Sequence, residues 1–113
     1  MVQKSREFHD YVMHEVFAGI ENITSRPMFG GYGIYRDGVF FALISGGSLY
    51  FKADDETKGE FERRGSRPFR YSAKGRGEVA LSYWEVPADV LENRTELRDW
   101  IDRAIRAQLR GDR

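Results

Sequence analysis

The stretch that decides the fold reads RPMFGGYGIYRDGVFFALISGGSLYFKAD and runs from Arg26 to Asp54. Two tight-turn signals divide it. Asp37-Gly38 predicts a type I′ hairpin, because glycine at the second turn position accepts the positive φ that this turn requires. Gly46-Gly47 marks the next turn. The stretch therefore predicts a meander of three antiparallel strands: Tyr32–Arg36, Val39–Ser45 and Ser48–Ala53.

The middle strand, Val39–Ser45, is apolar on both of its faces. Strict alternation assigns its residues to two sets, Val39, Phe41, Leu43 and Ser45 on one face and Phe40, Ala42 and Ile44 on the other. A strand that is buried on two sides needs helices over one face and a second layer over the other. In so short a chain a partner subunit is one candidate for that layer, so the pattern favours a homodimer or another protein over this face.

Helical periodicity appears on both sides of these strands. Apolar residues spaced three and four positions apart from Phe8 to Val16 predict a first helix over 5–18. Asp54 or Asp55 can cap a second helix, which ends at Gly65. Its acidic first turn suits the positive end of the helix dipole. Pro27, which cannot donate a hydrogen bond to a neighbouring strand, is expected at a strand edge or bend.

The rest of the chain completes an α+β pattern. Pro68–Tyr71 and Val79–Trp84 predict two further strands around a turn at Lys74–Gly77. Asn93 or Thr95 can cap a last helix that ends before Gly111. The summed order is α-β-β-β-α-β-β-α, which predicts an antiparallel five-stranded sheet packed with helices.

Composition limits the classes of function. A chain of 113 residues predicts one domain, 1–113. The 18 Lys and Arg residues balance 18 Asp and Glu residues, so the chain lacks the basic excess that supports non-specific binding to nucleic acid. The absence of cysteine excludes disulfides and thiolate ligands. No apolar run approaches the roughly 20 residues that span a bilayer, so we expect a cytoplasmic protein without membrane contact.

Sites that suggest catalysis or ligand binding have simpler explanations. Gly30, Gly31 and Gly33 lie close together, but the chain continues from them into a strand and not a helix, which argues against a dinucleotide-binding loop. We interpret these glycines as backbone geometry: a bulge, a positive φ or the close approach of another backbone. His9 and His14 are five positions apart, a spacing that does not suit a helical metal pair.

Nucleophilic catalysis has equally little support. The serines that we considered lack a recognisable nucleophile elbow: Ser45, Ser48, Ser72 and Ser82. The acid pair Asp54-Asp55 is better explained as a helix start than as a general acid and base. We therefore expect no enzyme, no catalytic residue, no cofactor and no bound metal.

The stretch Arg63–Arg76 carries the main charge asymmetry of the chain. Its basic residues are Arg63, Arg64, Arg67, Arg70, Lys74 and Arg76. A solvated helix end and turn is the simpler interpretation, and a phosphate-binding patch with Tyr71, Tyr83 and Trp84 as stacking rings is the alternative. Alternation places Tyr83 and Trp84 on opposite faces of the sheet, so core packing is favoured over a stacking platform. Under the alternative, Arg70, Lys74 and Arg76 contact the nucleic acid.

Arg26 and Lys52 are isolated charges among strand-forming apolar residues. The long stem of each side chain allows its charge to reach a rim, a carboxylate or a partner. Ion pairing within the fold is the simpler interpretation of both residues. With Arg70, Lys74 and Arg76 they form the set of candidate partner-binding residues.

A series of motifs runs in order along nearly the whole chain: Ser25–Tyr35, Asp37-Gly38, Phe41–Ile44, Leu49–Asp54, Phe61, Gly65, Pro68-Phe69, Tyr83–Pro87 and Leu91. In this order the motifs closely resemble the TfoX N-terminal domain family. The resemblance implies an antiparallel α+β fold of the secretion-chaperone-like type. This agrees with the order of elements that periodicity predicts.

The resemblance also implies a function. Named members of the family regulate natural competence genes in bacteria alongside a cyclic-AMP-responsive DNA-binding activator, and they carry a second, helical domain. We expect this chain to be the first domain alone, a non-catalytic regulatory or adaptor domain that acts by protein-protein interaction, often as a homodimer. The alternative is a nucleic-acid-binding domain that uses the basic region Arg63–Arg76.

Overall fold

The computed structural model describes residues 2–28, 30–73 and 77–110, and within them the side chains of 6–28, 30–70 and 82–110. The strands form one antiparallel sheet in the order β1-β2-β3-β4-β6-β5. Their bounds are β1 Ile23–Met28, β2 Gly31–Arg36, β3 Val39–Ser45, β4 Ser48–Lys52, β5 Pro68–Ala73 and β6 Gly77–Glu85. The helices are α1 Val2–Tyr11, continued by the π-helical turn η1 Val12–Val16, then α2 Asp55–Arg63, α3 Ala88–Leu91 and α4 Arg94–Leu109.

The predicted α+β fold with an antiparallel sheet is confirmed. Both predicted tight turns are present, and Asp37, Gly38, Gly46 and Gly47 all have positive φ. The caps of two helices also agree with the prediction. The Asp54 side chain accepts hydrogen bonds from the backbone N–H groups at the start of α2, and the Asn93 side chain does so for α4. The predicted turn residues Lys74 and Arg76 and the helix limit at Gly111 lie outside the described residues.

The sheet has one strand more than the five that were predicted. The additional strand, β1, pairs with β2 along its whole length and forms one edge of the sheet. It escaped prediction because Pro27 disfavours a strand. An edge strand tolerates proline, since one of its sides has no neighbouring strand to receive a hydrogen bond. The first helix also begins at Val2 and not at residue 5, and it ends as a π-helical turn.

A β-bulge in β3 overturns the predicted assignment of its two phenylalanines. Tyr35 pairs with Phe40 and Ile34 pairs with Ala42, so Phe41 is an extra residue without a partner in β2. Two residues of a bulged strand oppose one residue of its neighbour, and this shifts the alternation beyond that point. Phe41 therefore lies in the same buried cluster as Ala42, whereas Phe40 packs against the cluster on the opposite face.

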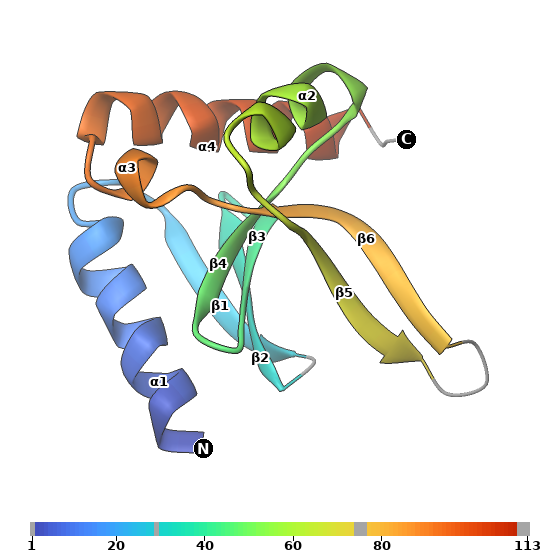
Figure 1. Ribbon diagram of the computed structural model, residues 1–113. Coiled ribbons are helices and arrows are strands. Elements are labelled where there is room, and N and C mark those ends of the chain that lie inside the picture. Colours follow the sequence, from blue (N-terminus) through green and yellow to red (C-terminus); the bar gives the residue numbers. More distant parts are fainter. Residues whose placement is uncertain (1, 29, 74–76, 111–113) are drawn as a thin grey trace.

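One face of the sheet is covered by the helices. α4 contacts β3 and β4, α1 contacts β3, and α2 contacts β6 (Figure 1). Trp84 packs in this layer and Tyr83 is buried in the other, so the predicted separation of these two rings is confirmed. Within the described part of the chain, none of the helices has the length and apolar character needed to cross a bilayer. The opposite face of the sheet carries a separate layer of side chains.

Candidate functional site

The second face of the sheet carries a row of three aromatic rings, one from each of three strands. The ring centroid of Phe40, on β3, lies 5.2 Å from that of Tyr35 on β2 and 5.4 Å from that of Tyr83 on β6. Tilted rings at these separations are in favourable contact. The bulge at Phe41 makes the row, because it turns Phe40 away from the helices.

The three rings lie closer together than the spacing of their strands in a flat sheet would place them. Tyr35 and Tyr83 belong to strands that are three strand spacings apart in the sheet order. Three spacings measure about 14 Å in a flat sheet. Phe40 nevertheless contacts both rings, so the outer rings are closer together than the strands that carry them. The side chains converge above this face of the sheet, and we name it the concave face for that convergence.

A small apolar cluster forms the base of this concave face. Leu43, Phe69 and Tyr83 are buried, and Phe40 and Tyr50 are partly buried against them. The rings of Tyr50 and Phe69 meet edge to face with their centroids 5.1 Å apart. Burial raises the pKa of the Tyr83 phenol well above its usual value, and burial together with the nearby Glu85 raises that of Tyr50. Both phenols are therefore neutral at physiological pH.

One cation lies at each outer ring of the row. The Arg26 guanidinium carbon is 5.7 Å from the centroid of the Tyr35 ring, and the Lys52 ammonium nitrogen is 5.5 Å from that of the Tyr83 ring. Both distances are within the range of cation–π attraction. Neither cation forms an ion pair with any residue that the structure describes. The expectation of ion pairing within the fold is thus wrong for the described residues.

Two glycines allow other atoms to pack closely against this part of the sheet. A Cβ atom at Gly33 would lie 2.7 Å from Cε of Met28, so the absence of a side chain on β2 leaves room for that methionine. A Cβ atom at Gly31 would lie 1.9 Å from the carbonyl oxygen of Ile44. Gly30 has a φ of +76°. The interpretation as backbone geometry is confirmed for Gly30 by its positive φ and for Gly31 by the close approach of another backbone, whereas the atoms close to Gly33 belong to side chains.

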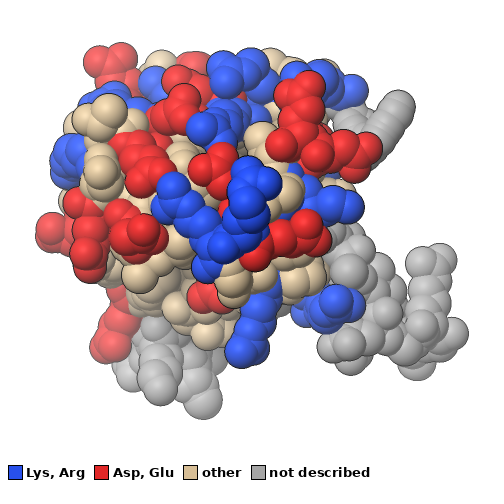
Figure 2. Space-filling model, turned by 45° about the horizontal axis from the view of Figure 1, so that its top comes forward, with Lys and Arg blue, Asp and Glu red and all other residues tan. Residues whose placement is uncertain are grey.

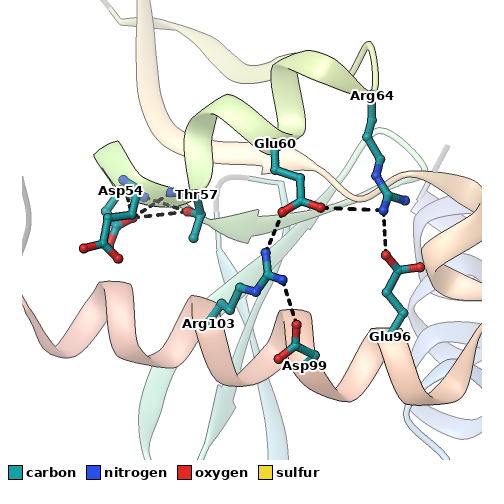
Figure 3. Close-up of polar contacts among 8 residues, drawn as sticks. Asp54, Thr57, Glu60, Arg64, Glu96, Asp99 and Arg103 are labelled. Atoms are coloured by element: carbon teal, nitrogen blue, oxygen red, sulfur yellow. Dashed lines mark hydrogen bonds and ion pairs between the residues drawn. The ribbon is translucent and has the colours of Figure 1, made fainter.

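The basic stretch Arg63–Arg76 is divided between different roles. Arg64 lies 2.6 Å from Glu96 (Figure 3) and 3.3 Å from Asp89. Its guanidinium lies over the Trp100 ring. Arg64 therefore links α2 to α4. Arg63, Arg67 and Arg70 are exposed, whereas Lys74 and Arg76 lie outside the described residues. Besides the ion-paired Arg64, the described part of this stretch thus retains three exposed cations.

The carboxylates on the helix side serve the packing of α2 against α4. Glu60 on α2 lies 2.7 Å from Arg103 on α4, which also lies 2.8 Å from Asp99 (Figure 3). The hydrogen bond from Arg103 holds the pKa of Glu60 below its usual value. Figure 2 shows acidic and basic side chains interspersed on this side of the molecule. Such a mixed surface does not create the single-sign field that attracts a polyanion.

A histidine on α1 contacts both an acid and a serine. His9 Nε2 lies 2.8 Å from Ser25 Oγ on β1, and Nδ1 lies 3.0 Å from the adjacent Asp10. The order of these groups resembles that of a catalytic triad. Ser25, however, lies in regular pairing opposite Ile34, and the His9 ring stacks on Tyr32 at 3.9 Å. We interpret the contact as the attachment of α1 to the edge of the sheet.

Two observations on the described residues bear on the binding of a small molecule or a metal. A hollow between α2 and α4 has a volume of about 10 Å³, which is room for one water molecule. No group of three or more His, Asp or Glu residues lies close enough to hold a metal ion in the part of the chain that the structure describes. The concave sheet face with its two cations is therefore the surface that we consider for function.

Comparison with known proteins gives a consistent result. The family model described as the TfoX N-terminal domain matches residues 15–108. Protein Sxy of Escherichia coli (strain K12) is 29% identical over 87 residues, which is 77% of this chain and 41% of that protein. DNA transformation protein TfoX1 of Aliivibrio fischeri (strain ATCC 700601 / ES114) is 35% identical over 51 residues, which is 45% of this chain and 24% of that protein. The matched region thus spans less than half the length of each of these two relatives.

Proposed function

The chain belongs to the TfoX N-terminal domain family, and we propose that it is a non-catalytic regulatory domain that binds another protein and thereby affects bacterial gene expression. One relative is named a DNA transformation protein, so genes for DNA uptake are the first candidates for the targets of this domain. A role in gene expression places the domain in the cytoplasm. A second copy of the chain is one candidate for this partner.

The observation that carries the proposal is the unpaired state of two cations on the concave sheet face. Arg26 and Lys52 form no ion pair with any described residue, and each lies over a ring of the aromatic row. Aromatic rings and arginine are enriched at the centres of protein interfaces. Half-buried rings between two cations thus combine the apolar and the charged contact that a protein partner uses.

Direct binding of nucleic acid through Arg63–Arg76 is the second candidate function. Arg63, Arg67 and Arg70 are exposed and support it. Arg64 weakens it, since its charge is already opposed by Glu96, Asp89 and Glu60. The balanced net charge of the chain weakens it further.

Affinity capture from the native cell tests the proposal, with nuclease present so that nucleic acid does not bridge the proteins. The baits are the wild-type chain, the double variant Arg26→Ala/Lys52→Ala, and the control Arg63→Ala/Arg70→Ala. We expect the wild type and the control to retain the same proteins and the Arg26/Lys52 variant to lose them. Identical captures by all three baits would contradict the proposal, and loss only in the Arg63/Arg70 control would favour the basic stretch.

A transcript measurement tests the regulatory part separately. The chromosomal gene is replaced by the Arg26→Ala/Lys52→Ala form, and its transcript profile is compared with that of a deletion strain. We expect both strains to change the same set of genes, because loss of the partner contact should equal loss of the domain. A wild-type profile in the variant strain would exclude this face from regulation, provided that thermal unfolding shows a folded variant.

A further inference from the structure

The two cations of the concave face are held apart and not clustered. Arg26 stands on β1 and Lys52 on β4, three strands away in the sheet order. Three strand spacings correspond to about 14 Å. The half-buried rings of Tyr35 and Phe40 belong to the two strands between them. A ligand that meets both charges therefore crosses an aromatic floor.

An extended polypeptide has matching dimensions. Side chains i, i+2 and i+4 of a strand point in the same direction, and the first and last of them are about 13 Å apart. Acidic side chains at i and i+4 would thus reach Arg26 and Lys52, while an apolar side chain at i+2 would contact Phe40. Neither cation forms an ion pair with a carboxylate of the described residues, so the two acids of such a segment would be complementary to them in charge.

A single nucleic-acid strand fits this face less well. Sequence-tolerant binding of single strands uses aromatic rings whose faces are open to stack on bases. Here Arg26 lies over the Tyr35 ring and Lys52 lies over the Tyr83 ring, which is also buried. Two separated cations with occupied rings favour carboxylates over a row of phosphates.

We infer that the concave face binds an extended peptide segment of the pattern acid-x-apolar-x-acid, with one carboxylate at Arg26, the other at Lys52 and the apolar side chain at Phe40. The inference rests on the proposed function, since it names the chemistry of the partner segment at that same face. The segment lies across the strands, so it requires no free backbone groups of the sheet. Specificity comes from the spacing of the two charges.

The probe for this inference is the synthetic peptide Gly-Ser-Glu-Ser-Leu-Ser-Glu-Ser-Gly, titrated into isotopically labelled protein and followed by NMR. A peptide of the same composition, Gly-Ser-Glu-Leu-Ser-Glu-Ser-Ser-Gly, places its two acids three positions apart and on opposite sides of an extended chain. A lysine peptide, Gly-Ser-Lys-Ser-Leu-Ser-Lys-Ser-Gly, and a nine-nucleotide thymidine strand complete the set. The proteins are the wild type, Arg26→Ala/Lys52→Ala, the charge reversal Arg26→Glu/Lys52→Glu, and the control Arg63→Ala/Arg70→Ala.

We expect the first peptide to bind the wild type and the control equally, with shifted amide signals at Tyr35, Phe40, Lys52 and Tyr83. Loss of both cations should weaken binding by roughly five- to tenfold, as expected for two exposed ion pairs. The charge-reversed protein should prefer the lysine peptide. A merely structural role of the two cations would not produce this exchange of preference.

Three outcomes would overturn the inference. They are the absence of saturable binding up to about 1 mM peptide, equal affinity for the two acidic peptides, and tighter binding of the thymidine strand at this face. Failure of the inference is distinguishable from failure of the proposed function. If the cell still yields a protein whose capture depends on Arg26 and Lys52 while the peptide does not bind, the domain binds a partner of different chemistry; if both fail, the proposed function fails.

Discussion

His9 Nε2 on α1 lies 2.8 Å from Ser25 Oγ on β1, so a helix is joined to an edge strand sixteen positions away in the sequence. β1 has a neighbouring strand on one side only. We predict that Ser25→Ala lowers the free energy of unfolding by about 1 kcal/mol, the usual value of one hydrogen bond. Urea denaturation measures this change.

Thr24→Ala is the matched control for that prediction, because Thr24 is an exposed neighbour on the same strand. Its effect should stay within about 0.5 kcal/mol, as is typical of surface positions. Equal losses for the two variants would show that His9 contributes nothing to the attachment of α1.

Gly31 and Gly33 differ in how readily their neighbours could make room for a substituted side chain. At Gly31 a Cβ atom would meet a backbone carbonyl oxygen at 1.9 Å, and backbone cannot move without breaking the β2–β3 pairing. At Gly33 the nearest atoms belong to the flexible end of Met28. We predict that Gly31→Ala destabilises the protein by about 3 kcal/mol or more and Gly33→Ala by about 1 kcal/mol.

Thermal and urea unfolding of the two glycine variants test this order. Gly30→Ala is a useful third variant, since its Cβ atom would meet nothing within 4 Å and only the positive φ is strained. If Gly33→Ala were more harmful than Gly31→Ala, the close approach of Ile44 to β2 would not have the importance that we give it.

The sequence was sufficient for the strands whose limits are set by glycine turns. Asp37-Gly38 and Gly46-Gly47 have the positive φ that their turns require, so local chemistry determined both hairpins. β1 was missed because the effect of Pro27 depends on whether a strand is central or at an edge. That position follows from the pairing of the whole sheet and not from neighbouring residues.

The candidate site was predicted only in its parts. Arg26 and Lys52 stood out as charges among apolar strand residues, but their aromatic contacts depend on the register of strands that are distant in sequence. The bulge was also invisible, since Phe40 and Phe41 are identical and either can face the helices. The local sequence pattern therefore identified the two cations, and only the tertiary structure shows the row of aromatic rings between them.

Trp100 is buried, and its Nε1 atom has no hydrogen-bond partner among the described residues. Its ring meets that of Phe61 edge to face at 4.8 Å, and the guanidinium groups of Arg64 and Arg103 lie over it. We predict that Trp100→Ala lowers the free energy of unfolding by about 3–5 kcal/mol. Trp100→Phe should cost only about 1 kcal/mol, because it removes an unpaired polar atom together with part of the ring.

Urea denaturation followed by circular dichroism compares the two variants without relying on tryptophan fluorescence. Nearly equal losses for Trp100→Phe and Trp100→Ala would mean that the indole nitrogen contributes a stabilising contact, contrary to our reading of its surroundings.

Lowering the pH should destabilise the protein through two carboxylates of the α2 region, those of Asp54 and Glu60. Burial by itself would raise the pKa of Asp54, but hydrogen bonds from Arg110 and from the start of α2 hold it below the usual value; the hydrogen bond from Arg103 lowers that of Glu60. A carboxylate whose folded pKa is lowered contributes stability that is present above its unfolded pKa, near 4. This contribution is lost as the pH falls below about 4.

We therefore predict that the free energy of unfolding decreases as the pH is lowered from about 5 to about 3. Urea titrations at several pH values in this range measure the decrease. The double variant Asp54→Asn/Glu60→Gln should have a shallower pH dependence, because asparagine keeps the helix cap but does not titrate. Glu62→Gln, an exposed neighbour on α2, is the control and should keep the wild-type slope. A double variant with the same slope as the wild type would assign the acid sensitivity to other groups.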